Sequence, residues 1–312
     1  MFSRAMVTGG AGFIGSTLVD RLIDDGVEVL VVDDLSRGKL ARLGAARRSG
    51  AMVFHQIDVR APQFREVATR FAPEVVFHLA AQIDAVASVS DPVADAETNV
   101  VGTVNVLTAA VAAAVGRVVY LSSGGAIYGA TKRIPATEKT SRHPATPYGV
   151  SKSVADDYLR LFADIHGLDF VSLGPSNVYG PRQDGAGEGG VVGTFTSRLL
   201  AGERPIVYGD GSQTRDFVYV EDVADACVRA AVRGGGMYLN ISTGIETPVA
   251  RLVDMLAVAT GRHIAPEYAP AREGDVARSC LDPSAAKRRL GWEPWTSLDR
   301  GLDQTVDWFK AR

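Results

Sequence analysis

Residues 5–15 form an apolar run that turns directly into glycines, and this stretch constrains the fold more than any other part of the chain. Residues 10–15, Gly-Ala-Gly-Phe-Ile-Gly, fit the spacing G-x-G-x-x-G, while Gly9, Gly12 and Gly15 fit the related G-x-x-G-x-x-G. Glycines so placed allow a tight turn, a close backbone approach to a pyrophosphate, and a helix packed hard on a strand. The stretch therefore predicts a strand, a phosphate-binding turn and a helix.

The segment after the glycines continues this pattern. Residues 16–25 place their apolar side chains on one face, which predicts a helix whose positive N-terminus meets the phosphates. Residues 27–32 form a buried-strand run that ends at Asp33 and Asp34. An acid about twenty residues past the glycines can bond the adenosine ribose, and Asp33 has this position. Its charge repels a 2′-phosphate, which favours NAD over NADP, although the nearby Arg37 weakens this preference.

Composition excludes several classes of partner. The chain has 312 residues, 46% of them hydrophobic, which is enough for one large domain or two closely packed ones. Its net charge of −3 provides no basic field, so we expect no nucleic acid partner. Cys227 and Cys280 form neither a C-x-x-C motif nor a disulfide framework, which favours the cytoplasm and predicts no metal site. We expect no membrane association, because no signal peptide or spanning segment is evident.

Strand-like and helix-like segments alternate along the chain. This order predicts an α/β fold, a Rossmann-type doubly wound parallel sheet with right-handed crossovers. A long helical stretch is expected at residues 93–115. Further strands are expected at residues 51–54, 74–79, 117–121, 169–173 and 237–241.

The alternation loosens after residue 173, which suggests a second domain. We expect residues 1–173 to form the NAD-binding domain, with residues 218–245 returning to it. Residues 174–217 and 246–312 are expected to form a smaller C-terminal α/β domain that binds the substrate.

Tyr148 and Lys152 form a Y-x-x-x-K pair, and a helix starting near Tyr148 would place both side chains on one face. A lysine ammonium beside a phenol favours the phenolate, so we expect Lys152 to lower the pKa of Tyr148. Such a phenol can take a proton from a sugar hydroxyl and later return it. The lysine can also bond the nicotinamide ribose. His78 lies inside a predicted strand, and we interpret it as a core histidine.

Together these features resemble the extended short-chain dehydrogenase/reductase superfamily, and within it the NAD-dependent epimerase/dehydratase family of the UDP-glucose 4-epimerase type. The similarity covers nearly the whole chain. The motifs that carry it are residues 8–15 (Thr-Gly-Gly-Ala-Gly-Phe-Ile-Gly), 78–82 (His-Leu-Ala-Ala-Gln), 122–129 (Ser-Ser-Gly-Gly-Ala-Ile-Tyr-Gly), Tyr148 with Lys152, 177–183 (Asn-Val-Tyr-Gly-Pro-Arg-Gln), 209–211 (Gly-Asp-Gly), 214–217 (Thr-Arg-Asp-Phe) and 272–275 (Arg-Glu-Gly-Asp).

The resemblance implies a UDP-sugar 4-epimerase with tightly bound NAD. Tyr148 would take the proton of the sugar 4-hydroxyl while hydride moves to the nicotinamide. The resulting 4-keto sugar would turn over before hydride returns to its other face, which inverts C4. The resemblance also implies a homodimer, formed through the helices at residues 93–115 and 150–166.

The same resemblance assigns site residues. It implies NAD contacts at Gly9, Gly12, Phe13, Ile14, Asp33, Asp34, Ser36, Gly38, Asp58, Val59, Leu79, Ala80, Ala81, Gln82, Asn99, Ser122, Tyr148 and Lys152. It implies substrate contacts at Ser123, Gly124, Tyr148, Asn177, Val192, Ile206, Val207, Tyr208, Arg215, Arg272 and Asp275. Arg215 and Arg272 match the positions that clamp the diphosphate, since forked guanidinium donors suit phosphate oxygens. Residues 206–208, with Val192 nearby, would line the uracil, whereas Arg182 is expected to be a solvated surface charge.

The sequence departs from the family pattern at three positions, one of which is Asp84, where some relatives have a lysine near the cofactor phosphate. Gly124 stands where the family usually keeps a Ser or Thr hydroxyl over the sugar, four residues before the tyrosine that aligns with Tyr128. We predict that Ser123 supplies this hydroxyl as a catalytic residue, with Ser122 or a water as the alternative. Ser279 stands where many galactose-type epimerases carry a bulky tyrosine, which leaves room for a 2-acetamido group.

Three other functions compete with a UDP-glucose/UDP-galactose epimerase. One is a 4-epimerase of UDP-glucuronate or of a UDP-N-acetylhexosamine. Another is a sugar 4,6-dehydratase, which needs an acid–base pair that residues 124–126, Gly-Gly-Ala, do not offer. The third is a non-catalytic nucleotide-sensing module, which could lose Tyr148 or Lys152 without penalty, yet this chain keeps both.

Overall fold

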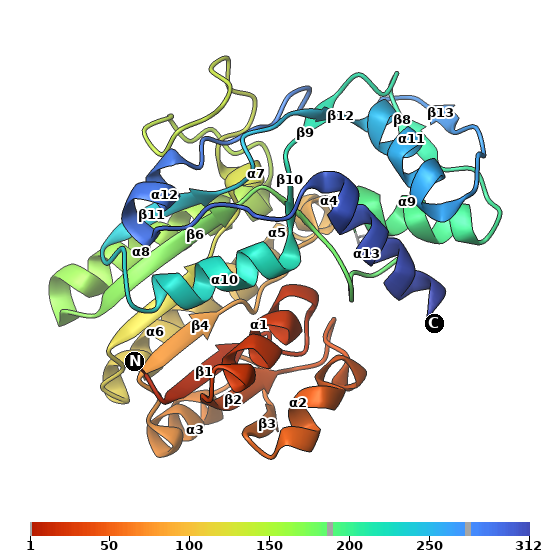
Figure 1. Ribbon diagram of the computed structural model, residues 1–312. Coiled ribbons are helices and arrows are strands. Elements are labelled where there is room, and N and C mark those ends of the chain that lie inside the picture. The colour runs from red at the N-terminus through yellow and green to blue at the C-terminus, as the bar shows by residue number, and fades with distance from the viewer. Residues whose placement is uncertain (1, 186–189, 272–275) are drawn as a thin grey trace.

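A seven-stranded parallel sheet lies at the centre of the computed structural model, which describes residues 2–185, 190–271 and 276–312 (Figure 1). The strand order is β11-β6-β5-β4-β1-β2-β3. The strands are β1 (Arg4–Thr8), β2 (Glu28–Asp33), β3 (Met52–Gln56), β4 (Val75–His78), β5 (Arg117–Leu121), β6 (Asp169–Pro175) and β11 (Met237–Ile241). This confirms the predicted doubly wound fold, including the late strand that returns to the sheet beside β6.

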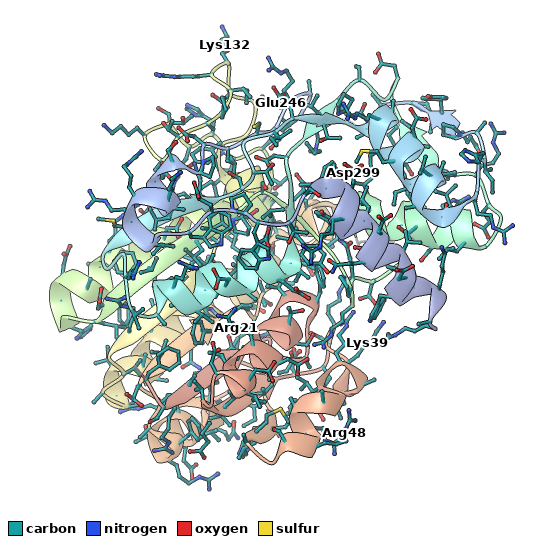
Figure 2. The ribbon with its side chains drawn as sticks, viewed as in Figure 1. Arg21, Lys39, Arg48, Lys132, Glu246 and Asp299 are labelled. Atoms are coloured by element: carbon teal, nitrogen blue, oxygen red, sulfur yellow. The ribbon has the colours of Figure 1, made fainter. Side chains whose placement is uncertain are left out.

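Side chains alternate along the strands and build a hydrophobic core on each face of the sheet. Val7 and Val31 pack in one core, while Met6 and Leu30 pack in the other. The helices that contribute to the first core are α1 (Phe13–Asp24), α2 (Gly44–Ser49), α10 (Val220–Ala230) and α12 (Ser284–Leu290). Those that contribute to the second are α3 (Gln63–Phe71), α6 (Gly102–Ala112) and α8 (Pro147–His166). Arg21 of α1, labelled in Figure 2, pairs with Asp225 of α10 at 3.4 Å.

The helical stretch predicted at residues 93–115 consists of three consecutive helical segments. It begins as α5 (Pro92–Ala96), widens into the π-helical turn η2 (Glu97–Val101), and continues as α6. The short helix α4 (Ala85–Ser90) precedes it. All of these segments pack against α8. Two further short helical segments, η1 (Leu40–Leu43) and α7 (Gly124–Ile127), follow β2 and β5.

The remaining elements form a second body, here called the small lobe, around a core of its own. Its helices are α9 (Gly190–Leu200), α11 (Val249–Thr260) and α13 (Leu298–Lys310). Its short strands pair two by two: β7 (Asn177–Tyr179) with β10 (Phe217–Tyr219), β8 (Ile206–Tyr208) with β13 (Glu267–Ala269), and β9 (Thr214–Arg215) with β12 (Thr247–Pro248). The predicted domain limits stay a prediction.

Parallel strands end at the same edge of a sheet, and this edge faces the small lobe (Figure 1). The segments that follow β1, β2, β4, β5 and β6 all contribute residues to one cleft at this edge. None of the helices in the described ranges is long and apolar enough to cross a membrane.

Candidate active site

The glycine turn after β1 leaves its backbone open to the cleft. Gly9 has a φ of +70°, and a Cβ there would lie 2.7 Å from the Ala80 nitrogen. A Cβ at Gly15 would collide with the Gly9 carbonyl. No side chain fits at either position, so the turn is tight and α1 packs closely against it. Gly12 begins α1 without a side-chain cap, which leaves the first N–H groups of the helix available for an anion.

Asp33 joins the glycine turn to the end of β2. Its Oδ2 accepts a hydrogen bond from the Ala11 nitrogen at 2.9 Å, and its Oδ1 accepts one from the Leu35 nitrogen at 2.9 Å. Burial raises the pKa of this carboxyl, and the two backbone hydrogen bonds oppose the rise. A Cβ at Gly38 would collide with the carboxylate, so the loop after β2 lies directly against it. The residue predicted to bind ribose therefore also holds the turn in place.

The cleft has a volume of about 900 Å³, near the upper end of the range for small-molecule sites, roughly 300–1,000 Å³. It brings together most of the predicted cofactor residues with the predicted catalytic ones. The predicted residues that line it are Gly9, Gly12, Phe13, Ile14, Asp33, Asp34, Ser36, Gly38, Asp58, Val59, Leu79, Ala80, Ala81, Ser122, Ser123, Tyr148, Lys152 and Asn177.

Two predicted cofactor residues, Gln82 and Asn99, do not line the cleft and instead bind each other. The Gln82 nitrogen donates to Asn99 Oδ1 at 2.9 Å, and Asn99 Nδ2 donates back to the Gln82 carbonyl at 2.9 Å. Both side chains also donate to Asp95. They brace the loop after β4 against η2, and their contact with NAD stays a prediction.

The predicted catalytic pair lies at the start of α8. Thr146 caps this helix by accepting a hydrogen bond from the Gly149 nitrogen at 3.3 Å, and Pro147 occupies the first turn, where proline suits a helix. Tyr148 and Lys152 are therefore one helical turn apart, as predicted, and both reach the cleft. Lys152 Nζ donates to the Leu121 carbonyl at 2.9 Å and lies 6.0 Å from the centroid of the Tyr148 ring.

The expectation that Lys152 lowers the pKa of Tyr148 is wrong for this structure. Burial raises the pKa of Tyr148 to about 12, while a hydrogen bond with Ser123 acts in the opposite direction. Burial also lowers the pKa of Lys152 to about 8. The ammonium is directed to the end of β5 and not to the phenol, so desolvation outweighs its attraction for a phenolate.

Ser123 has the geometry of the predicted hydroxyl, and Gly124 does not have room for one. Ser123 lines the cleft together with Tyr148, and its side chain opposes the rise in the pKa of the phenol. A Cβ at Gly124 would collide with Leu281 and lie 2.6 Å from the Gly174 carbonyl oxygen. Ser122 Oγ is already engaged, because it donates to Asp156 Oδ2 at 3.2 Å.

Of the four residues predicted to line the uracil, two have side chains in the core of the small lobe and two have partly exposed side chains. Val192 and Val207 are each 1% exposed and pack in the core of the small lobe, so their side chains are not on the cleft wall. Any contact with the base would have to come from their backbone. Ile206 and Tyr208 are half-buried and also lie outside the cleft wall.

The predicted phosphate residues are only partly described. Arg215 Nη1 donates to the Thr214 carbonyl at 2.8 Å and the Val276 carbonyl at 2.7 Å, which holds its guanidinium at the small lobe. Arg272 and Asp275 lie outside the described residues. The expectation that Arg182 is a solvated charge is wrong, because it is partly buried and forms an ion pair with Asp20 of α1.

Sequence reasoning missed a group of ion pairs across the cleft. Asp184, on the side of the small lobe, lies 2.5 Å from Lys39 Nζ and 3.0 Å from Arg42 Nη2. All three residues line the cleft, and Lys39 is labelled in Figure 2. Lys39 and Asp184 are 145 residues apart in the chain, so no local pattern could reveal their contact.

His78 is a core histidine, as predicted. It is buried, and its ring nitrogens lie 2.7 Å from Thr8 Oγ1 and 3.0 Å from Thr103 Oγ1. Burial, and then the charge of Lys152, lower the pKa of His78 to about 3, so the imidazole is neutral at physiological pH.

Comparison with known proteins assigns this arrangement to a family. Residues 5–241 match the family model for the NAD dependent epimerase/dehydratase family. The chain is 46% identical to a UDP-glucose 4-epimerase of Mycolicibacterium smegmatis over 99% of both chains. A Thermotoga maritima UDP-glucose 4-epimerase with UDP-glucose superposes with a TM-score of 0.95, 42% identity and 99% coverage of both chains. A Methanobrevibacter ruminantium UDP-N-acetylglucosamine 4-epimerase superposes with a TM-score of 0.94, 32% identity and coverage of 100% of this chain and 99% of that one. The chain thus belongs to the NAD-dependent epimerase/dehydratase family.

Proposed function

We propose that this protein is an NAD-dependent UDP-hexose 4-epimerase that interconverts UDP-glucose and UDP-galactose. The observation that carries this proposal is that Ser123, Tyr148 and Lys152 line the same cleft as the glycine turn. A sugar C4 held beside the phenol would therefore also lie beside a cofactor bound on that turn. The identity to UDP-glucose 4-epimerases over the whole chain supports the choice of substrate.

The glycine turn and Asp33 fit NAD. The uncapped N-terminus of α1 suits the pyrophosphate, and the close approach of Gly9 to Ala80 leaves a smooth backbone wall against which a flat cofactor can lie. Asp33 accepts one hydrogen bond at each carboxylate oxygen, so lone pairs remain for ribose hydroxyls. When bound, NAD supplies the group that accepts hydride from the sugar carbon and returns it.

Tyr148 is the proton carrier in this proposal. In its phenolate form, Tyr148 takes the proton of the sugar 4-hydroxyl and, as a phenol, gives it back after the sugar has turned. Ser123 aligns the two hydroxyls. Lys152, fixed by the Leu121 carbonyl, supplies a positive charge beside the phenol and has N–H groups left for a ribose hydroxyl.

The small lobe holds the nucleotide sugar in this proposal. Asn177 on the cleft wall and Arg215 at β9 contact the diphosphate, together with Arg272. Residues 174–217 and 246–312 would thus form the substrate domain. The enzyme functions in the cytoplasm, in keeping with its two free, buried cysteines.

A panel of UDP-sugars tests the function, with products identified by NMR. We expect UDP-galactose and UDP-glucose to interconvert until both are present. If both sugars are returned unchanged and another UDP-sugar turns over, the assignment of substrate is wrong. The UDP-N-acetylhexosamines are the second candidate, because Ser279 is a small, half-buried residue and a solved relative with this activity shares the fold.

A homodimer is proposed from the apolar surface of α4, α5 and α8. These helices pack together and expose several large apolar side chains, Val86, Val89, Val93, Val150, Leu161 and Ile165. A second copy of the same surface would bury them. Light scattering tests the proposal: the wild type should have twice the mass of one chain, and Val93→Asp should reduce it. A wild-type monomer would contradict the dimer.

A further inference from the structure

Asp95 is a fully buried carboxylate behind the active site, and among the described residues its hydrogen-bond donors are all neutral. It lies on α5 and accepts hydrogen bonds from Gln82 Nε2 at 2.9 Å, Asn99 Nδ2 at 3.0 Å and Ser151 Oγ at 2.6 Å. Burying a charge is costly unless a countercharge or strong hydrogen bonds compensate it. Hydrogen bonds from neutral groups satisfy its oxygens but leave its negative charge in place.

Ser151 connects Asp95 to the helix that carries the catalytic pair. Ser151 lies between Tyr148 and Lys152 in the first turns of α8, and its hydroxyl is the link from that helix to Asp95. Burial lowers the pKa of Lys152 to about 8, and the negative charges of Asp156 and then of Asp95 oppose this fall. Burial raises the pKa of Tyr148 to about 12, and the charge of Asp95 adds to this rise.

Within the described residues, the other ionisable groups that act on the pair are neutral or already compensated. His78 on β4 has a pKa lowered by burial to about 3, and Tyr120 on β5 has a pKa raised well above its usual value by burial. Asp156 on α8 also acts on Lys152, but it forms its own ion pair with Arg142 at 2.8 Å. Asp95 differs from Asp156 because its bonded partners carry no positive charge.

We propose that Asp95 is a positioning residue for the epimerase reaction: its carboxylate is the fixed countercharge of Lys152 and, through Ser151, holds the first turns of α8 against the loop after β4. The lysine thereby keeps its proton in a site that excludes water. The same negative charge keeps the phenol of Tyr148 protonated until substrate and cofactor are in place.

The experiment is the pH dependence of kcat/KM for UDP-galactose in Asp95→Asn. This change removes one charge and keeps the size of the side chain. Two groups this close titrate as a coupled pair, so both limbs of the profile belong to Tyr148 and Lys152 together. Without the negative charge, the protonated lysine is less favoured and the phenolate is more favoured. Both limbs should therefore move to lower pH, by about one pH unit for a charge lost in a buried site.

Two matched variants separate charge from structure. Ser151→Ala removes the hydrogen bond to Asp95 but keeps the charge, so both limbs should stay in place even if turnover falls. Asp157→Asn removes an exposed carboxylate from the same helix and should leave the whole profile unchanged. An Asp95→Asn profile whose limbs coincide with those of the wild type would overturn the proposal.

A second measurement needs no substrate. Melting temperatures of Asp95→Asn, Lys152→Met and the double variant form a cycle. If the two residues are countercharges, the double variant melts above the temperature obtained by adding the two single shifts. Additive shifts overturn the proposal. If Asp95→Asn alone does not fold, a double variant that also fails to fold overturns it. The pH experiment rests on the proposed function, so the wild type is assayed first: an inactive wild type refutes the function, whereas unmoved limbs in an active variant refute only the part played by Asp95.

Discussion

The two sides of the cleft are built from contacts of different range. On the sheet side, Asp33 holds the glycine turn through a bond to Ala11, only 22 residues away. On the side of the small lobe, Asp216 beside Arg215 accepts bonds from Thr243, 27 residues away, and Leu281, 65 residues away. The glycine turn is therefore held by a motif that is nearly continuous in the chain, whereas the loop that carries Arg215 is held by distant segments.

The two sides of the cleft also differ in whether their residues should affect turnover or binding. The sheet side buries its ionisable groups, and desolvation shifts the pKa values of Tyr148 and Lys152. The substrate side holds a half-buried arginine whose guanidinium is fixed by backbone carbonyls. Changes on the sheet side should thus affect turnover, and changes on the other side should affect binding.

Tyr148→Phe should give the largest effect. It removes the proton carrier but keeps the ring, so kcat should fall by about 10²- to 10⁴-fold while the Kd for UDP-galactose stays within a few-fold. Steady-state kinetics and calorimetry measure the two quantities. Tyr158→Phe, a half-buried tyrosine on the same helix, is the matched control and should retain wild-type turnover. Full activity in Tyr148→Phe would refute the proposed chemistry.

Ser123→Ala and Gly124→Ser should show which of the two neighbouring residues at the end of β5 is the proper position for the hydroxyl. Ser123→Ala removes the hydroxyl that lines the cleft together with Tyr148, and we expect about a 10- to 100-fold lower kcat at an unchanged melting temperature. Gly124→Ser forces atoms against Leu281 and the Gly174 carbonyl, which should destabilise the protein by about 1–3 kcal/mol. If Gly124→Ser melts like the wild type and restores turnover to Ser123→Ala, the hydroxyl belongs at position 124 instead.

Arg215→Ala tests the binding side. Loss of one charged donor to a diphosphate should weaken UDP-sugar binding by about 10- to 100-fold, while kcat stays nearly constant. Calorimetry with UDP measures this directly. Arg278→Ala is the control, because Arg278 is an exposed arginine of the same region that pairs with Glu246. An unchanged Kd in Arg215→Ala would remove this residue from the diphosphate site.

The local sequence pattern was sufficient to predict the strands that build the sheet. The strands at residues 117–121 and 237–241 begin and end where predicted, because each is a short apolar run bounded by polar or glycine residues. The start of α8 was predicted from Tyr148 and Lys152 alone, and Thr146 with Pro147 explains physically why the helix begins there. The alternation of strands and helices predicted the parallel sheet but not the order of its strands.

Other features depend on properties that only the tertiary structure sets. Val192 and Val207 are predicted to line the uracil, but their side chains are packed in a core whose members come from three helices and several short strands, so their contact with the base stays a prediction. The pKa of Tyr148 was expected to fall, but its direction depends on burial and on where Lys152 Nζ points. No local pattern in the sequence singles out Asp95, because its contact with Ser151 spans 56 residues.

Asp184→Asn should have the smallest effect and tests how far the two sides are independent. Asp184 bridges the cleft to Lys39 and Arg42, and the hydrogen bonds of these cations outweigh burial and lower the pKa of its carboxyl. The side chains of Asp184 and Lys39 are 41% and 59% exposed, so water and salt screen this pair, whereas the Arg42 side chain is only 4% exposed and its pair is screened less. Loss of the bridge should let bound NAD leave only about two- to five-fold faster, measured by cofactor fluorescence on the holoenzyme, and high salt should reduce the difference. Glu293→Gln breaks an exposed pair with Lys287 and should not alter release. Equal release rates at low salt for Asp184→Asn and the wild type would mean that the bridge does not retain the cofactor, so the two sides would hold their ligands independently.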